Sequence, residues 1–191
     1  LAGSAIGYYG ASPSDTFDET SPAGTGFLAE VCEAWEAAAS PATGGDVRVA
    51  YLRTGIVLSA EGGALKKQLP LFKFGLGGKM GSGDQWQSWI HIDDEVTAIV
   101  HLLTSDLDGA VNLTAPNPVT NAEFTKTLGD VLGRPTFLPI PKFGPKLVLG
   151  GELADNLLFS GQKVVPTALQ ADGYEFEYPT LDGALRDLLK K

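Results

Sequence analysis

The sequence is poor in the residues that build disulfide frameworks and most metal sites. Cys32 is the only cysteine among 191 residues, so neither an internal disulfide nor a cysteine-ligated metal site can form. The two histidines, His91 and His101, stand on different expected elements, which argues against a histidine metal site. A chain without disulfides fits a reducing compartment, and we expect a cytoplasmic protein.

Clustered positive charge is also missing. The formal net charge is −9, and no run of Lys or Arg exceeds a pair. Because nucleic acids and anionic membrane surfaces are bound through basic patches, we expect neither as a partner. The absence of any apolar stretch of 18 or more residues excludes a membrane-spanning helix. The expected partner is a small-molecule substrate, with the choice between monomer and homodimer left open.

The first ten residues lack an initiator methionine and a basic leader. They are small and apolar, and they end at Gly10 before a Ser-Pro-Ser-Asp cluster at 12–15. This pattern is typical of a chain that begins partway along a strand rather than of a signal peptide. We therefore expect the carboxy-terminal part of a longer protein.

What the sequence does contain is an alternation of strand and helix patterns through residues 1–133. Apolar residues make up 43% of the chain, enough for a buried core. The patterns predict strands at 46–59, 86–92 and 110–113, and helices at 26–39, 64–74, 95–104 and 121–133. Helical spacing places Phe27 and Trp35 in the core. Such an order predicts βαβ units, a parallel sheet and an α/β fold.

The sequence pattern changes at Arg134, after which four prolines fall within eleven residues. Here we expect short helices at 143–149 and 152–158, a helical step at 162–171, a strand at 174–178 and an amphipathic helix at 181–189. The predicted organisation is therefore a main α/β domain over 1–133 and a smaller α+β tail domain over 134–191.

Several ordered segments resemble the extended short-chain dehydrogenases. The segments at 4–10, 52–58 and 88–94 are similar to the Ser-Ser-x-x-Val-Tyr-Gly, Leu-Arg-x-x-Asn-Val-Tyr and Phe-Ile-His-Val-Asp-Asp patterns of that superfamily. A fuller resemblance is to an atypical branch, the epimerase family proteins, some of which carry a cell-division-inhibitor-like label. It rests on Gly-Tyr-Tyr-Gly, Phe-Leu-Ala-x-Val-Cys-x-x-Trp-Glu, Gly-Leu-Gly-Gly-x-x-Gly-Ser-Gly and Leu-Phe-Ser-Gly-Gln-Lys-Val-x-Pro, at 7–10, 27–36, 75–83 and 158–166.

The resemblance implies the second half of a Rossmann-like domain that binds NADP or NAD. It also implies an oxidoreductase or epimerase acting on a small carbonyl or a nucleotide-sugar-type substrate. In such proteins the cofactor pyrophosphate is held by a glycine-rich turn after the first strand, and this sequence has no such turn in that position. For the glycine-rich segment 75–83, a mobile substrate flap, a plain surface loop and a phosphate cradle are the alternatives.

The catalytic chemistry of the resembled proteins needs a tyrosine, a nearby lysine and a serine or threonine. Ser4 matches the serine position, with tight packing as the alternative. Counting back from Glu36 puts Cys32 at the lysine position and Leu28 at the tyrosine position, and neither performs that acid–base chemistry. Tyr9 is the candidate substitute acid, with packing on the crevice wall as the alternative.

Binding roles are assigned by position in the expected sheet. Arg53 and Gly55 stand at a strand's carboxyl end, where ligands bind in α/β proteins, so we expect them, with Ser4, to contact the cofactor. Arg53 holding an Asp or Glu is the alternative. Gln85, Gln87 and His91 are the substrate-binding candidates.

For His91, the structural alternative is a hydrogen bond to backbone across the sheet, with Asp93 or Asp94 capping the next helix. Gln87 stands where nucleotide-sugar enzymes carry a phosphate-binding arginine, and Gln87 has no charge to offer. A cofactor-binding sensor or regulator that has lost turnover is therefore the second functional hypothesis.

Overall fold

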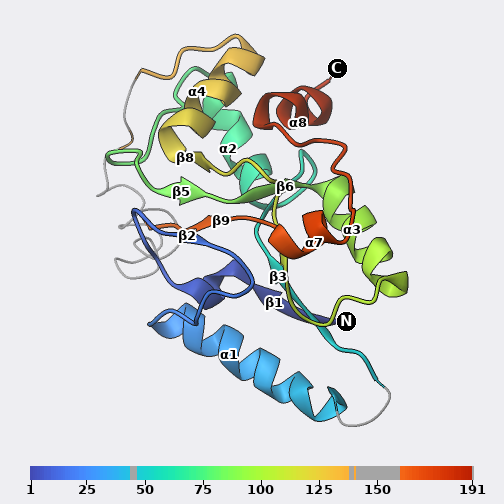
Figure 1. Ribbon diagram of the computed structural model, residues 1–191. Helices are drawn as coiled ribbons and strands as arrows, with labels where there is room; N and C mark the ends of the chain where they lie inside the picture. Colours follow the sequence, from blue (N-terminus) through green and yellow to red (C-terminus); the bar gives the residue numbers. More distant parts are fainter. Residues whose placement is uncertain (44–46, 138–139, 141–159, 191) are drawn as a thin grey trace.

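A computed structural model describes residues 1–43, 47–137, 140 and 160–190 (Figure 1). Its centre is a three-stranded parallel sheet in the order β1 (Ala2–Ala5), β3 (Ala50–Thr54) and β7 (Gly109–Leu113). All three strands run in the same direction, so their carboxyl ends lie along one edge of the sheet. The α/β class and the parallel sheet expected from the sequence are confirmed.

Helices cover both faces of this sheet. Helix α1 (Phe27–Ala39) lies against β1 on one face, and α3 (Ile92–Thr104) and α7 (Thr167–Ala171) lie on the other (Figure 1). Strand residues alternate between the faces. Leu52 therefore packs with Leu102 and Leu169 on the α3 side, whereas the neighbouring Arg53 reaches Glu36 on α1.

The strand expected over 46–59 is instead two strands that belong to different sheets. β3 ends at Thr54, and β4 (Ile56–Leu58) pairs with β6 (Trp89–His91). The break falls at Gly55, where a Cβ atom would lie 2.5 Å from the Ser88 carbonyl oxygen and 2.8 Å from Thr114 Cγ2. Only glycine lets the backbone pass this close to its neighbours. The strand expected over 86–92 is likewise divided, into β5 (Trp86–Gln87) and β6.

A second core lies beyond the sheet, around β4 and β6. Helices α2 (Gly63–Lys73), α4 (Asn121–Leu132) and α8 (Leu181–Leu188) enclose it, with Trp89 fully buried at its centre. Two small ladders connect the parts of the chain: β5 pairs with β8 (Val119–Thr120), and β2 (Thr16–Phe17) pairs with β9 (Lys163–Val164). The β9 strand was not expected, because its segment was interpreted as part of a helical step.

The helix ends show where neighbouring residues in the sequence were enough to predict the structure. Thr120 and Glu123 form a reciprocal capping box at the start of α4, and Gly133 ends that helix in the left-handed conformation, as expected. The cap expected for α3 was wrong. Neither Asp93 nor Asp94 caps it; the His91 imidazole does, because its Nδ1 accepts the backbone N–H of Asp93.

Residues 174–178 are not a strand, although their sequence alternates. Instead of joining a ladder, the N–H groups of Glu177 and Tyr178 donate to the two carboxylate oxygens of Asp94, at 2.8 and 3.0 Å. The Tyr174 hydroxyl donates to the Asp94 carbonyl oxygen at 2.9 Å. This buried carboxylate therefore ties the end of the chain to α3. The helices expected at 143–149 and 152–158 lie outside the described residues.

Candidate functional site

The main candidate site is a cavity of about 390 Å³ at the edge where β1 and β3 end. Ala5 is the last residue of β1, Thr54 is the last residue of β3 and Gly55 comes directly after it. All three line the cavity. Clefts outside the carboxyl ends of parallel strands are the usual ligand sites of α/β folds. The rest of the lining comes from the segment after β1, from residues within 25–35 at and before α1, from Ile56, from 85–88 and from 160–162.

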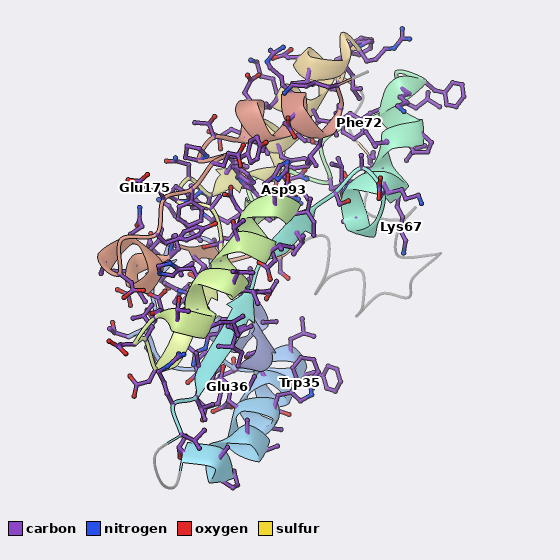
Figure 2. The ribbon with its side chains drawn as sticks, turned by 90° about the vertical axis from the view of Figure 1, so that its right-hand side faces the viewer. Trp35, Glu36, Lys67, Phe72, Asp93 and Glu175 are labelled. Carbon is purple, nitrogen blue, oxygen red and sulfur yellow. The ribbon has the colours of Figure 1, made fainter. Side chains whose placement is uncertain are left out.

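One wall of the cavity is the apolar face of α1. Leu28 and Cys32, which the count from Glu36 assigns to the tyrosine and lysine positions of the resembled enzymes, both line it. Burial raises the pKa of the Cys32 thiol, so the thiol stays protonated and is a poor nucleophile. Phe27 and Trp35 were expected in the core, and this was wrong: they line the cavity with exposed fractions of 68% and 54%. Figure 2 shows Trp35 projecting away from the sheet.

The opposite wall is polar but uncharged. Gln85, Gln87, Ser88 and Gln162 line it. Gln162 is fixed, because its Nε2 donates to the Ile6 carbonyl oxygen at 2.8 Å. The Gln87 Oε1 atom is buried and has no hydrogen-bond partner among the described residues. An unpaired buried acceptor is costly, so Gln87 is suited to receive a donor from a ligand.

Behind the α1 wall, three of the expected site residues form one buried network. The Glu36 carboxylate accepts from Arg53 Nε and Nη2, both at 2.9 Å, and from the Ser4 hydroxyl at 2.7 Å. Arg53 Nη1 donates to the Tyr9 hydroxyl at 3.0 Å, and Tyr9 donates to Asn112 Oδ1 at 2.7 Å. The Arg53 guanidinium also lies 3.4 Å from the Tyr8 ring centroid.

This network does not face the cavity, because Ser4, Tyr9 and Arg53 are absent from its lining. Each of the three guanidinium nitrogens of Arg53 already donates within the chain. Burial raises the pKa of Tyr9 despite the opposing effect of Arg53, so the phenol stays neutral. The structure thus brings the three residues together. Arg53 holds a carboxylate, that of Glu36, which is the alternative given for it above; this pair is called the clamp below. Their catalytic and cofactor-binding roles stay predictions.

A buried carboxyl that the sequence did not single out lies beside β3. Glu95 on α3 has an exposed fraction of 8%; its Oε1 accepts from the Thr54 hydroxyl at 3.0 Å, and its Oε2 has no partner among the described residues. Burial raises the pKa of Glu95 to about 7, and the Thr54 hydrogen bond only partly opposes this. In the sequence, only its position directly after Asp93 and Asp94 could have drawn attention to Glu95.

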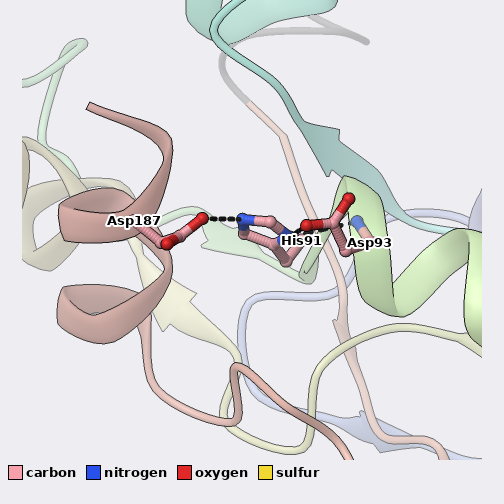
Figure 3. A group of neighbouring side chains, drawn as sticks. All are labelled: His91, Asp93 and Asp187. Carbon is pink, nitrogen blue, oxygen red and sulfur yellow. Dashed lines mark hydrogen bonds and ion pairs between the residues drawn. The ribbon is translucent and has the colours of Figure 1, made fainter. Parts of the chain in front are cut away.

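His91 lies away from the cavity, between two carboxylates (Figure 3). Its Nε2 is 3.6 Å from Asp187 Oδ2, its Nδ1 is 3.8 Å from Asp93 Oδ2, and its ring stacks on Tyr178. The expected hydrogen bond across the sheet was wrong, because Nδ1 accepts from the Asp93 N–H two residues away. In a neutral ring this places the proton on Nε2, so neither nitrogen offers a free lone pair to a metal.

A second cavity, of about 350 Å³, adjoins the first and shares Ala11, Gln85, Ser160 and Gly161 with it. Ser12, Pro13, Ser82 and Asp84 complete its lining. Ser82 belongs to the glycine-rich segment 75–83, which is fastened to α4: the Met80 N–H donates to Asn121 Oδ1 at 2.8 Å. The flap role of that segment stays a prediction.

Comparison with known proteins shows what the chain is similar to. The chain is 46% identical over its whole length to the Arabidopsis thaliana "Epimerase family protein SDR39U1 homolog, chloroplastic", and it covers 54% of that protein. Relatives from plants and mycobacteria that are named epimerase family proteins thus match this chain over nearly all of its length. The sequence profile of a domain of unknown function (DUF1731) matches residues 140–188, inside the tail domain predicted over 134–191.

Two solved structures in this group bear on the site. The human epimerase family protein SDR39U1 (isoform 2), crystallised with NADPH, is 36% identical, with a TM-score of 0.90 over 97% of this chain and 63% of that chain. The nucleoside-diphosphate sugar epimerase from Corynebacterium glutamicum is 37% identical, with a TM-score of 0.73 over 97% of this chain and 36% of that chain. Both support the Rossmann-like fold.

This chain thus spans about half to two-thirds of the length of most of these relatives. Among the described residues, no helix is long and apolar enough to cross a membrane. The cytoplasmic location and the domain boundary at 133 stay predictions.

Proposed function

We propose that this chain carries the nicotinamide and substrate side of an NADP(H)-dependent oxidoreductase that acts on a small carbonyl compound. The observation that carries the proposal is the cavity at the carboxyl ends of β1 and β3. It occurs in a chain 36% identical to a protein crystallised with NADPH, and the similarity covers nearly the whole of this chain.

The cavity walls fit a nicotinamide ring. The ring is flat and apolar on its faces, which suits the Leu28 and Cys32 wall. Its carboxamide carries N–H donors at the rim, and Gln87 Oε1 is an acceptor without a partner among the described residues. When bound, the cofactor supplies or accepts hydride; the residues of this chain orient the ring and exclude water.

The described lining of the cavities offers no cationic side chain to the pyrophosphate of the cofactor. Among the described residues that line the two cavities there is no Lys or Arg. In the described part of the chain, β1 also pairs with a strand on one side only. We propose that the pyrophosphate site belongs to a preceding part of the protein, which adds strands next to β1.

A second candidate function is cofactor binding without turnover, as in a redox sensor. It is favoured by the α1 wall, where Leu28 replaces a phenol and Cys32 a cationic amine, so the wall supplies no proton for a hydride relay. Both candidates need NADPH to bind, and they differ only in whether the bound nucleotide then transfers hydride to a carbonyl compound.

Titration of NADPH and NADH into the protein at the full length of its relatives, monitored by nicotinamide fluorescence, tests the shared step. We expect NADPH to bind, and Gln87→Leu to weaken binding by about tenfold, the usual cost of one buried hydrogen bond. The matched control is Gln170→Leu, which makes the same change at an exposed position on α7 and should leave binding unchanged. If neither nucleotide binds, both candidate functions are wrong.

NADPH consumption over a panel of aldehydes and ketones then separates the two candidates. Saturable turnover that requires the intact cavity supports the oxidoreductase. Tight NADPH binding without turnover of any carbonyl in the panel, with a bound nucleotide that alters the protein's thermal stability, supports the sensor instead.

A further inference from the structure

We infer that the substrate is an uncharged carbonyl or hydroxyl compound, and that, apart from the cofactor, the two cavities accept neither nucleoside diphosphates nor other phosphorylated molecules. This inference rests on the proposed function and refines it. It starts from the second cavity, which continues the first one outward through Ala11, Gln85, Ser160 and Gly161. A molecule held in the first cavity can therefore extend into the second one.

The described lining of both cavities is nearly free of formal charge. Hydroxyl, amide and backbone groups provide the polarity, and the one charged side chain among the described lining residues is Asp84, at the outer end. A carboxylate repels phosphate and adds to the cost of removing it from water. Proteins normally match a bound diphosphate with Arg or Lys in bidentate or charge-assisted hydrogen bonds.

Charges of both signs stand just outside the lining. The Ser12 hydroxyl, which lines the second cavity, donates to Asp15 Oδ2 at 2.7 Å, so a second carboxylate stands directly behind this wall. Two described cations also stand near these groups. The Cδ atom of Lys79 would lie 3.1 Å from a Cβ atom added at Gly83, between Ser82 and Asp84. The ammonium of Lys163 lies 4.7 Å from the centroid of the Trp86 ring. Neither lysine lines either cavity.

One feature of the first cavity favours an oxygen atom with partial negative charge. The amino end of α1 lines it, and the N-cap Gly26 makes no side-chain cap bond, so backbone N–H groups of the first turn remain available. A helix terminus carries roughly half a positive charge, and Glu30 in the same turn offsets part of it. This suits a carbonyl or hydroxyl oxygen and falls short of the two full charges of a diphosphate.

The unpartnered Gln87 Oε1 supplies the complementary requirement, a hydrogen-bond donor on the ligand. The cavities thus present donors at the α1 terminus, an acceptor at Gln87, and an apolar face at Leu28 and Cys32. A small uncharged aldehyde, ketone or polyol with one apolar side satisfies all three.

The test uses the full-length protein saturated with NADPH and matched probe pairs that differ only in charge. Benzaldehyde is compared with 4-carboxybenzaldehyde, and glyceraldehyde with glyceraldehyde 3-phosphate, by NADPH consumption and by quenching of bound-NADPH fluorescence. UDP and UDP-glucose are titrated by calorimetry. We expect the uncharged member of each pair to be preferred by at least about tenfold, and UDP to show no binding, because a charged group loses one charge-assisted bond or more.

Substitutions that change the charge of the cavities should change which ligands bind. Gln87→Arg places a cation in the first cavity and should give measurable UDP affinity, whereas Asp84→Asn should weaken the discrimination against the charged probes. Asp106→Asn is the matched control, because it removes the same charge from an exposed loop before β7, at the opposite edge of the sheet.

Competitive sub-millimolar binding of UDP or UDP-glucose to the wild-type protein would overturn the inference. So would a Gln87→Arg protein that binds NADPH normally and gains no affinity for UDP, since the substrate then does not approach this wall. Either result leaves NADPH binding intact, so it is distinguishable from failure of the proposed function.

Discussion

The buried Glu95 carboxyl should make the stability of the protein depend on pH in a way that one substitution removes. Burial raises its pKa from 4.5 to about 7, and the Thr54 hydrogen bond does not compensate. Because the folded-state pKa lies above the unfolded one, the folded protein binds the proton more tightly. The contribution to stability is fully present below pH 4.5, declines as pH rises, and is lost above about pH 7.

The size of the effect comes from the two pKa values. Moving the pKa of a carboxyl from 4.5 to about 7 corresponds to about 3.5 kcal/mol, at about 1.4 kcal/mol for each pKa unit. Glu95→Gln keeps an oxygen that can accept from Thr54 and cannot ionise. Burying the Gln amide adds a cost that does not depend on pH. The quantity to measure is therefore how the difference in free energy of unfolding between variant and wild type changes with pH.

Urea denaturation at intervals between pH 5 and pH 8 measures this difference, and other titrating groups cancel because both proteins contain them. We expect Glu95→Gln to gain about 2.5 kcal/mol relative to wild type between pH 5 and pH 8, because part of the change already occurs below pH 5. Glu175→Gln, at an exposed position, is the control for removing one charge. A difference that stays constant over this range would refute the assignment of Glu95 as a buried, largely desolvated carboxyl.

The contacts around α1 and α4 give three further predictions. Arg53→Met leaves the partly buried Glu36 charge without its cation, so the free energy of unfolding should fall by about 3 kcal/mol, and a loss below about 1 kcal/mol in urea denaturation would contradict the clamp. Cys32, buried and with a raised pKa, should react with a disulfide reagent at pH 8 far more slowly than free cysteine does, and equal rates would show that the α1 wall is open. Thr120→Ala removes the capping box of α4 and should cost about 1 kcal/mol, measured as a lower urea midpoint; an unchanged midpoint would show that the cap is not needed.

Features encoded by residues close in sequence could be predicted. The start and end of α4 are set by Thr120, Glu123 and Gly133, which act within one turn of the helix end. The parallel order of the central strands was predictable from the alternation of strand and helix patterns. In both cases the decisive interactions involve neighbouring residues or the general rules of βαβ connection.

Features decided by distant neighbours could not be predicted. The strand breaks at Gly55 because Ser88 and Thr114 approach it, and the sequence around Gly55 records neither contact. The alternation at 174–178 suggested a ladder, but its N–H groups bind the Asp94 carboxylate, which lies far away in the sequence on α3. Helical spacing grouped Phe27 and Trp35 on one face and could not reveal that this face borders a cavity.

The identity of the residues on α1 bears most directly on mechanism. Positions 28, 32 and 36 succeed one another at intervals of four and so lie on one helix face. Glu36 fixes that face to the sheet through Arg53 and Ser4, and Leu28 and Cys32 thereby line the cavity. The helix thus presents the positions used by the resembled enzymes while lacking their phenol and amine. A proton for any carbonyl reduction must therefore come from water, from the substrate or from a group outside α1, and the turnover panel decides whether such a source exists.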